Sequence, residues 1–157
     1  MEKINRLVQE SNQDFRTADH LIYINATMHG SNKLLLFIAK KLYLAGLNSI
    51  DAVLHYEKVE RRISFLPSDF GSKIYIFESE VLPRMRVVPD ILEVLKELNL
   101  ILNEHKESPI EFSRGDKFVI CNDGYSTIRT LDLETLKSYR NIIRNFLYIS
   151  NGMVKNV

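Results

Sequence analysis

The stretch "NKLLLFIAKKLYLAGLNSIDAVLHYEKVERRIS", residues 32–64, carries the clearest helical pattern in the chain. Its apolar side chains recur every three or four residues, which places them on one face of a helix. These positions are Leu35, Ile38, Leu42, Ala45, Ala52, Tyr56, Val59 and Ile63, with Ser49 between Ala45 and Ala52. An unbroken helix of this length would span about 50 Å, whereas a domain of this size has a radius of gyration near 15 Å. The pattern therefore predicts a helix that either projects or breaks.

The expected hinge is "AGLNS" at 45–49, because glycine weakens a helix and serine can cap a new one. An earlier helix is predicted from Lys3 to Met28. Its apolar face holds Ile4, Leu7, Val8, Phe15, Ala18, Leu21, Ile22 and Ile24. "HGSN" at 29–32 separates the two helices: Gly30 suits a left-handed helix end, and Ser31 or Asn32 can cap the next helix.

Two further helices and a hairpin follow. A short helix is predicted from Asp69 to Leu82, and a longer one from Pro89 to about His105. The β-prone runs 117–121 and 125–131 flank "NDG", with Gly124 suited to positive φ, which predicts a hairpin. The segment 108–117 is interpreted as a loop. Asp132 caps a last helix with an apolar stripe at Leu136, Tyr139, Ile142, Ile143, Phe146 and Leu147.

These elements predict an all-α, up-and-down bundle of about five helices, with a small β-hairpin at about 117–131 before the last helix. Residues 1–157 are expected to form one domain. The apolar share is 45%, the charged share 26% and the formal net charge +1, so no global field favours nucleic acid or membrane. Cys121 is the only cysteine, which excludes an intramolecular disulfide. With no signal peptide or apolar run long enough for a membrane span, we expect a cytoplasmic protein and no membrane contact.

The stretch "NSIDAVLHYEKVERR" at 48–62 is crowded with ionisable side chains. Asp51 and His55 are four residues apart and share a helix face, as half of a metal site would. Glu57 and Arg61 have the same spacing and are interpreted as a surface ion pair. A metal site in a bundle needs ligands from other helices, and the Glu-x-x-His pattern is absent. We therefore interpret this stretch as a solvated helix face and predict neither metal nor cofactor.

Candidate anion-binding residues lie elsewhere. Arg140 and Arg144 are four apart on the last helix, where like charges repel, so a phosphate between them would be stabilising. Asn141 follows the first of these arginines, and the polar segment 108–121 adds Arg114 and Lys117 as further candidates. Arg16 and His20 share a face of the first helix and, with Asp51 and His55, form an alternative site for stabilising a phosphate and moving a proton.

The two long N-terminal helices, with "LAGLNSIDAVLHYE" in the second, resemble the HEPN superfamily of small helical bundles. The resemblance implies a prokaryotic RNase, or a partner of a minimal nucleotidyltransferase. The catalytic motif of the family is an arginine and a polar residue, followed by a histidine after four to six intervening positions. Arg140-Asn141 and Arg144-Asn145 match its beginning, but 145–147 are Asn-Phe-Leu and 149–151 are Ile-Ser-Asn, so the histidine is absent.

We therefore predict a non-catalytic interaction module that forms a homodimer and binds a protein partner or RNA. The broad apolar faces of the first two helices favour self-association. One alternative is a metal-independent, HEPN-like RNase with a degenerate motif. Another is a structural subunit of a larger complex.

Overall fold

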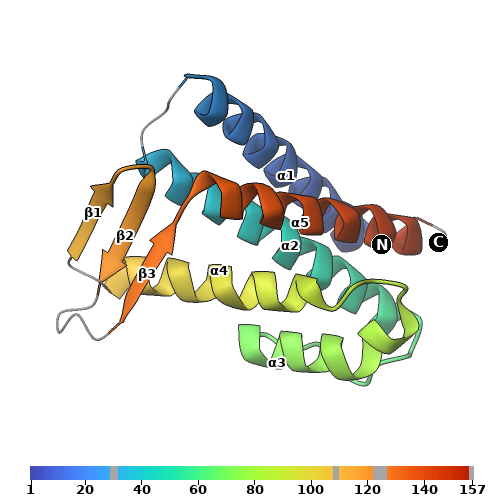
Figure 1. The fold of residues 1–157 in the computed structure, drawn as a ribbon. Helices are drawn as coiled ribbons and strands as arrows, with labels where there is room; N and C mark the ends of the chain where they lie inside the picture. Colours follow the sequence, from blue (N-terminus) through green and yellow to red (C-terminus); the bar gives the residue numbers. More distant parts are fainter. Residues whose placement is uncertain (29–31, 108–109, 122–126, 156–157) are drawn as a thin grey trace.

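The computed structural model describes residues 1–28, 32–107, 110–121 and 127–155. Long helices lie side by side, and a small sheet stands at one end of them (Figure 1). This confirms the predicted helical bundle with a small β element before the last helix. In chain order the elements are α1 Glu2–Met28, α2 Lys33–Val59, α3 Phe70–Ile76, a π-helix η1 Phe77–Val81, a 3-10 turn η2 Leu82–Arg84, α4 Asp90–Glu107, β1 Ile110–Arg114, β2 Lys117–Cys121, β3 Ile128–Leu131 and α5 Leu133–Val154.

The central helix α2 is continuous, and the hinge that Gly46 suggested does not form. Its 27 residues span about 40 Å, and 13 of them are buried. The helix is accommodated because α1 and α5 are also long and lie along it (Figure 1). The bundle is therefore elongated, which is why this helix needs neither to project nor to break.

Small side chains let the neighbouring helices approach α2 closely. A Cβ added at Gly46 would lie 2.6 Å from Leu95 Cδ2 of α4, so this glycine marks a helix contact. On the α5 side, the hydroxyls of Ser49 and Ser150 lie 2.6 Å apart in the core. On the α1 side, Ser11 donates to the carbonyl of Ala45 at 2.7 Å. The small residues that suggested a hinge therefore serve packing instead.

The end of α2 differs from the prediction, which extended the helix to residue 64. The backbone N–H of Arg62 donates to the Glu57 carbonyl at 2.8 Å, and that of Arg61 donates to the Lys58 carbonyl at 3.1 Å. This pair of bonds is a Schellman motif, in which the residue after the C-cap is left-handed. Arg61 occupies that position with φ 57°. The chain therefore reverses at a residue whose side chain gives no sequence signal for it.

The predicted cap Asp132 is present, and Asp69, predicted as the first residue of its helix, is a cap as well. The Asp69 carboxylate accepts the Ser72 N–H at 2.9 Å at the start of α3, and the Asp132 carboxylate accepts the Thr135 N–H at 2.8 Å at the start of α5. Asn32 precedes α2 without a side-chain cap. Its amide donates to the Gly115 carbonyl at 2.9 Å instead. Gly30, Ser31 and Gly124 lie outside the described residues.

The β element is a three-stranded antiparallel sheet in the order β1-β2-β3. The predicted strand 117–121 is confirmed, and the strand predicted over 125–131 is present as Ile128–Leu131. Interpreting 108–117 as a loop was wrong, because Ile110–Arg114 pairs with β2. The missed signal was "RGDK", in which Gly115 has φ +62° between paired Arg114 and Lys117. Arg129 of β3 fastens the sheet to α4 through 2.9 Å ion pairs with Glu97 and Glu104.

The central strand β2 supplies the buried side of the sheet. Phe118, Val119, Ile120 and Cys121 are all buried, and β2 contacts both α4 and α2. The thiol of Cys121 is free and buried. Within the described residues, no helix combines the length and apolar character that crossing a membrane requires.

The glycine contact predicts opposite effects for two matched substitutions. Gly46→Ala should lower the free energy of unfolding by about 1–3 kcal/mol, because the new methyl group overlaps Leu95 in the core. Gly152→Ala in α5 meets nothing within 4 Å and should raise it by about 0.5–1 kcal/mol. Urea unfolding followed by circular dichroism measures both. Equal effects of the two substitutions would contradict the close approach of α4 to α2.

Candidate functional site

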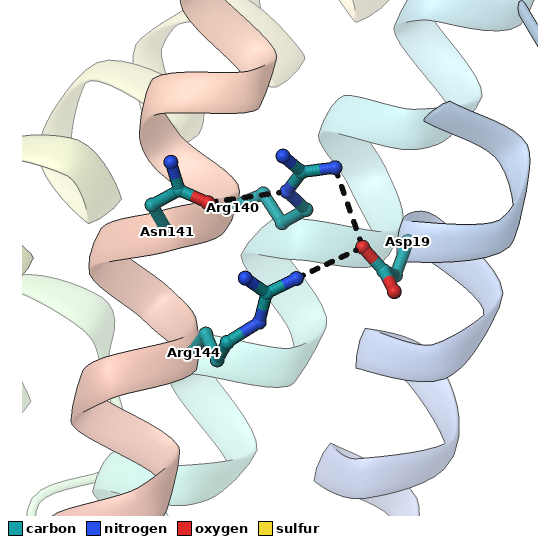
Figure 2. A network of polar contacts seen from close by, with 4 residues as sticks. All are labelled: Asp19, Arg140, Asn141 and Arg144. Atoms are coloured by element: carbon teal, nitrogen blue, oxygen red, sulfur yellow. Dashed lines mark hydrogen bonds and ion pairs between the residues drawn. The ribbon is translucent and has the colours of Figure 1, made fainter. Parts of the chain in front are cut away.

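A carboxylate on α1 holds two arginines of α5 together. Asp19 Oδ1 lies 3.4 Å from Arg140 Nη1 and 3.2 Å from Arg144 Nη2. Figure 2 shows both guanidinium groups turned toward this one oxygen, with Asn141 Oδ1 accepting from Arg140 Nε at 3.3 Å. The sequence predicted an anion between the two arginines. The protein itself supplies one, from a helix that lies beside α5.

The same helices enclose a hollow of about 550 Å³. It brings Arg16 and His20 of α1 together with Arg140 of α5, so the predicted arginine site and part of the alternative site are one site. The remaining lining comes from Asp19, Ile22, Tyr23, Ala26 and Lys137. Tyr23 is 66% exposed and offers its ring to solvent at the edge of the hollow.

Positive charge exceeds negative charge in this hollow. Its lining contains Arg16, Lys137 and Arg140 against the single carboxylate of Asp19, an excess of two before Arg144 is counted. The side chains of Asp19 and Arg144 are 43% and 50% exposed, so water competes for their ion pair. An exposed pair of this kind contributes only about 0–1 kcal/mol. The arginines are thus oriented by Asp19 without being locked to it.

Further contacts fix the direction of these side chains. The guanidinium of Arg144 lies 5.7 Å from the centre of the Phe15 ring, a cation–π contact across α1 and α5. Arg16 Nη2 donates to Gln13 Oε1 at 3.4 Å, and Lys137 lies 3.0 Å from Glu134, which is 80% exposed. Arg144 is thus held across α1 and α5, whereas Arg16 and Lys137 each have a partner on their own helix.

Arg114 and Lys117 do not line the hollow. They are paired across the tight turn between β1 and β2, and both are exposed. The pKa of Asp132 lies below its usual value, mainly because its carboxylate accepts the Thr135 N–H and partly because of the positive charge of Lys117. Since Asp132 caps α5, Lys117 lies near the N-terminal end of the helix that carries Arg140.

Asp51 and His55 also lie apart from this hollow. Asp51 pairs with Lys73 of α3 at 3.0 Å. His55 is partly buried on α2, and its pKa is lowered mainly by that burial and further by the charge of Lys3, although Asp51 opposes the shift. Within the described residues, no group of three or more His, Cys, Asp or Glu side chains is placed to hold a metal ion. The four residues of the predicted alternative site therefore lie in two separate places: Arg16 and His20 line the hollow, whereas Asp51 and His55 do not.

Sequence reasoning did not assign Asp19, Lys137 or Tyr23 to the site. Lys137 is three residues before Arg140, so their shared helix face was visible in the sequence. Asp19 and Tyr23 share a face of α1, but which neighbour that face meets depends on the packing of α1 against α5.

Comparison of the chain with protein-family models, curated proteins and solved structures finds no match. The HEPN resemblance therefore stays a prediction.

The partial burial of His55 predicts a pH dependence of stability. The pKa of His55 is lower in the folded protein than in the unfolded chain. The contribution of His55 to the free energy of unfolding is therefore fully present above the ordinary histidine pKa of about 6.5. That contribution is lost as the pH falls through the lowered folded value. Urea unfolding between pH 7.5 and 5 should show His55→Gln losing less stability than the wild type. Parallel pH profiles for the two proteins would contradict the assignment.

Proposed function

We propose that this chain is an RNA-binding module and that the hollow between α1 and α5 holds the phosphate backbone. The observation that carries the proposal is the convergence of Arg16, Lys137 and Arg140 on one hollow with a single carboxylate, with Arg144 beside them. Guanidinium groups match the geometry of phosphate oxygens. The site is strongly positive locally although the whole chain has a formal charge of only +1.

Two features favour RNA over an isolated phosphate. Tyr23 is 66% exposed at the edge of the hollow, where an unpaired base can stack on its ring. Lys117 lies near Asp132 at the N-terminal end of α5 and adds a further basic side chain beyond the hollow. A single strand can therefore place one phosphate between the arginines and its neighbours along α5.

The test is a gel-shift titration with labelled single-stranded RNA at several salt concentrations. About three phosphate contacts give a slope of log K against log salt near −2. Arg140→Gln should weaken binding about tenfold and reduce the magnitude of the slope by about 0.7, since one charged contact is lost.

Arg6→Gln provides the matched control, because Arg6 is an exposed arginine on α1, outside the hollow, and is likewise paired with a carboxylate, that of Glu10 at 3.8 Å. It should leave both affinity and slope nearly unchanged. Equal losses of RNA affinity in Arg6→Gln and Arg140→Gln would mean that net charge alone causes the effect, and would contradict binding in this hollow.

A second candidate, a metal-independent RNase, is favoured by one observation: His20 lines the same hollow as Arg140. The missing histidine of the family's motif then has a substitute on α1, where it can move a proton while Arg140 stabilises developing charge. Incubation of labelled RNA with EDTA separates the two functions. Cleavage that is lost in both His20→Ala and Arg140→Ala would identify the enzyme, whereas a shifted but intact RNA identifies the binding module.

Self-association and a protein partner, such as a minimal nucleotidyltransferase, stay predictions. The apolar face of α1 that suggested a dimer is covered within the chain, where Ile4, Leu7, Ala18 and Ile22 are buried. Exposed apolar side chains remain at Tyr148 and Val88, which line a hollow beside α5. Light scattering of the purified protein gives its mass in solution and decides whether it is a dimer.

A further inference from the structure

A second charged hollow lies at the opposite end of α5, beside the last turn of α2. It has a volume of about 590 Å³. Its charged groups are Glu57, Arg62, Arg84 and Arg86, and the apolar side chains of Ile149 and Met153 from α5 lie beside them. None of these residues takes part in the hollow between α1 and α5.

Glu57 organises this second hollow. Among the described residues it is the only charged side chain that is buried, with 1% of the side chain exposed. Its Oε1 lies 3.0 Å from Arg62 Nη1, and its Oε2 lies 2.5 Å from Arg84 Nη2. A buried carboxylate without such partners would cost several kcal/mol. These two contacts hold the guanidinium groups of Arg62 and Arg84 in place. The surface ion pair between Glu57 and Arg61, which their spacing predicted, was therefore wrong.

The backbone brings these arginines together from two directions. The Schellman motif at the end of α2 returns Arg62 to Glu57. Phe77 of η1 packs edge-on against Phe146 of α5, with ring centres 5.8 Å apart, which docks the segment before Arg84 against α5. π-Helical turns such as η1 occur frequently at functional sites.

Three consecutive residues form one wall of the hollow: Arg84, Met85 and Arg86. Arg84 ends the 3-10 turn η2, and the backbone becomes extended at Met85, which is 9% exposed. The hollow is therefore bordered by two guanidinium groups, one on each side of Met85 in the chain.

These guanidinium groups retain donors for a ligand. Arg84 Nη2 lies 2.5 Å from Glu57 Oε2, and a guanidinium has five N–H donors, so other donors of Arg84 remain for a ligand. Arg86 makes no hydrogen bond or ion pair within the described part of the chain. Three guanidinium groups against one carboxylate leave an excess of two positive charges in the lining, and Glu60 lies 3.8 Å from Arg62 outside it.

We propose that this hollow binds a small-molecule phosphate monoester, with the phosphate between Arg84 and Arg86. A monoester carries a charge of about −1.5 to −2 at pH 7, which matches the excess in the lining better than the single charge of a carboxylate does. Arginine pairs bind the three terminal oxygens of such a group bidentately. The apolar surface of Ile149 and Met153 receives the organic part of the ester.

The experiment is an NMR titration of the isotopically labelled full chain, with inorganic phosphate and phenyl phosphate as probes at constant ionic strength. Gly152 lines the hollow and has a readily identified amide signal. This signal should shift saturably with both probes, and at lower concentrations of phenyl phosphate because its ring contacts the apolar side chains. Arg86→Gln should weaken binding about tenfold through loss of a charged hydrogen bond.

Arg61→Gln is the matched control, because it removes the same charge one residue from Arg62 and outside the lining. It should bind both probes as the wild type does. Arg140→Gln with Arg144→Gln should also leave the Gly152 shift intact, so this result is independent of RNA binding between α1 and α5.

The competing structural explanation is that the arginines only complement the negative C-terminal ends of α2 and α5. It predicts no saturable shift at Gly152, or equal weakening in Arg61→Gln and Arg86→Gln, and either result would overturn the proposal.

Discussion

The burial of α2 along most of its length is the constraint on which the other elements depend. A helix that is buried on several sides must offer small side chains wherever a neighbour approaches closely, and it does so at Gly46 toward α4 and at Ser49 toward α5. Ser11 fixes α1 to the same turn of α2 through the Ala45 carbonyl. Because α1 and α5 thereby lie side by side on α2 (Figure 1), Asp19 can reach both arginines across the space between them.

The predictable parts of the fold are those decided within a few residues. The helical stripes follow from apolar spacing, and the cap at Asp132 follows from a carboxylate before a helix. The errors arose where tertiary contacts decide the outcome. Gly46 weakens an isolated helix, but here its missing side chain admits Leu95. Arg61 takes a left-handed conformation that sequence statistics reserve mainly for glycine, since Arg62 gains its contacts with Glu57.

The candidate site likewise has a part that local spacing predicts and a part that depends on tertiary packing. The shared face of Arg140 and Arg144 follows from their spacing alone. That His20 joins Arg140, whereas His55 does not, depends on which face of each helix meets α5, and no local pattern contains that information. Spacing also cannot distinguish an exposed carboxylate from a buried one, which is why Glu57 was interpreted as part of a solvated face although it lies in the core.

The two arginine clusters beside α5 differ in how firmly their own carboxylate holds them. Asp19 is 43% exposed, so in the proposed RNA-binding role a phosphate replaces it at little cost and the arginines exchange partners along the strand. Glu57 is 1% exposed and cannot release both arginines without leaving a bare charge in the core. Its arginines are therefore preorganised, which favours a compact ligand because less ordering is needed on binding. Under the two proposals, burial of the internal carboxylate separates a salt-sensitive surface for a polymer from a rigid site for a small anion.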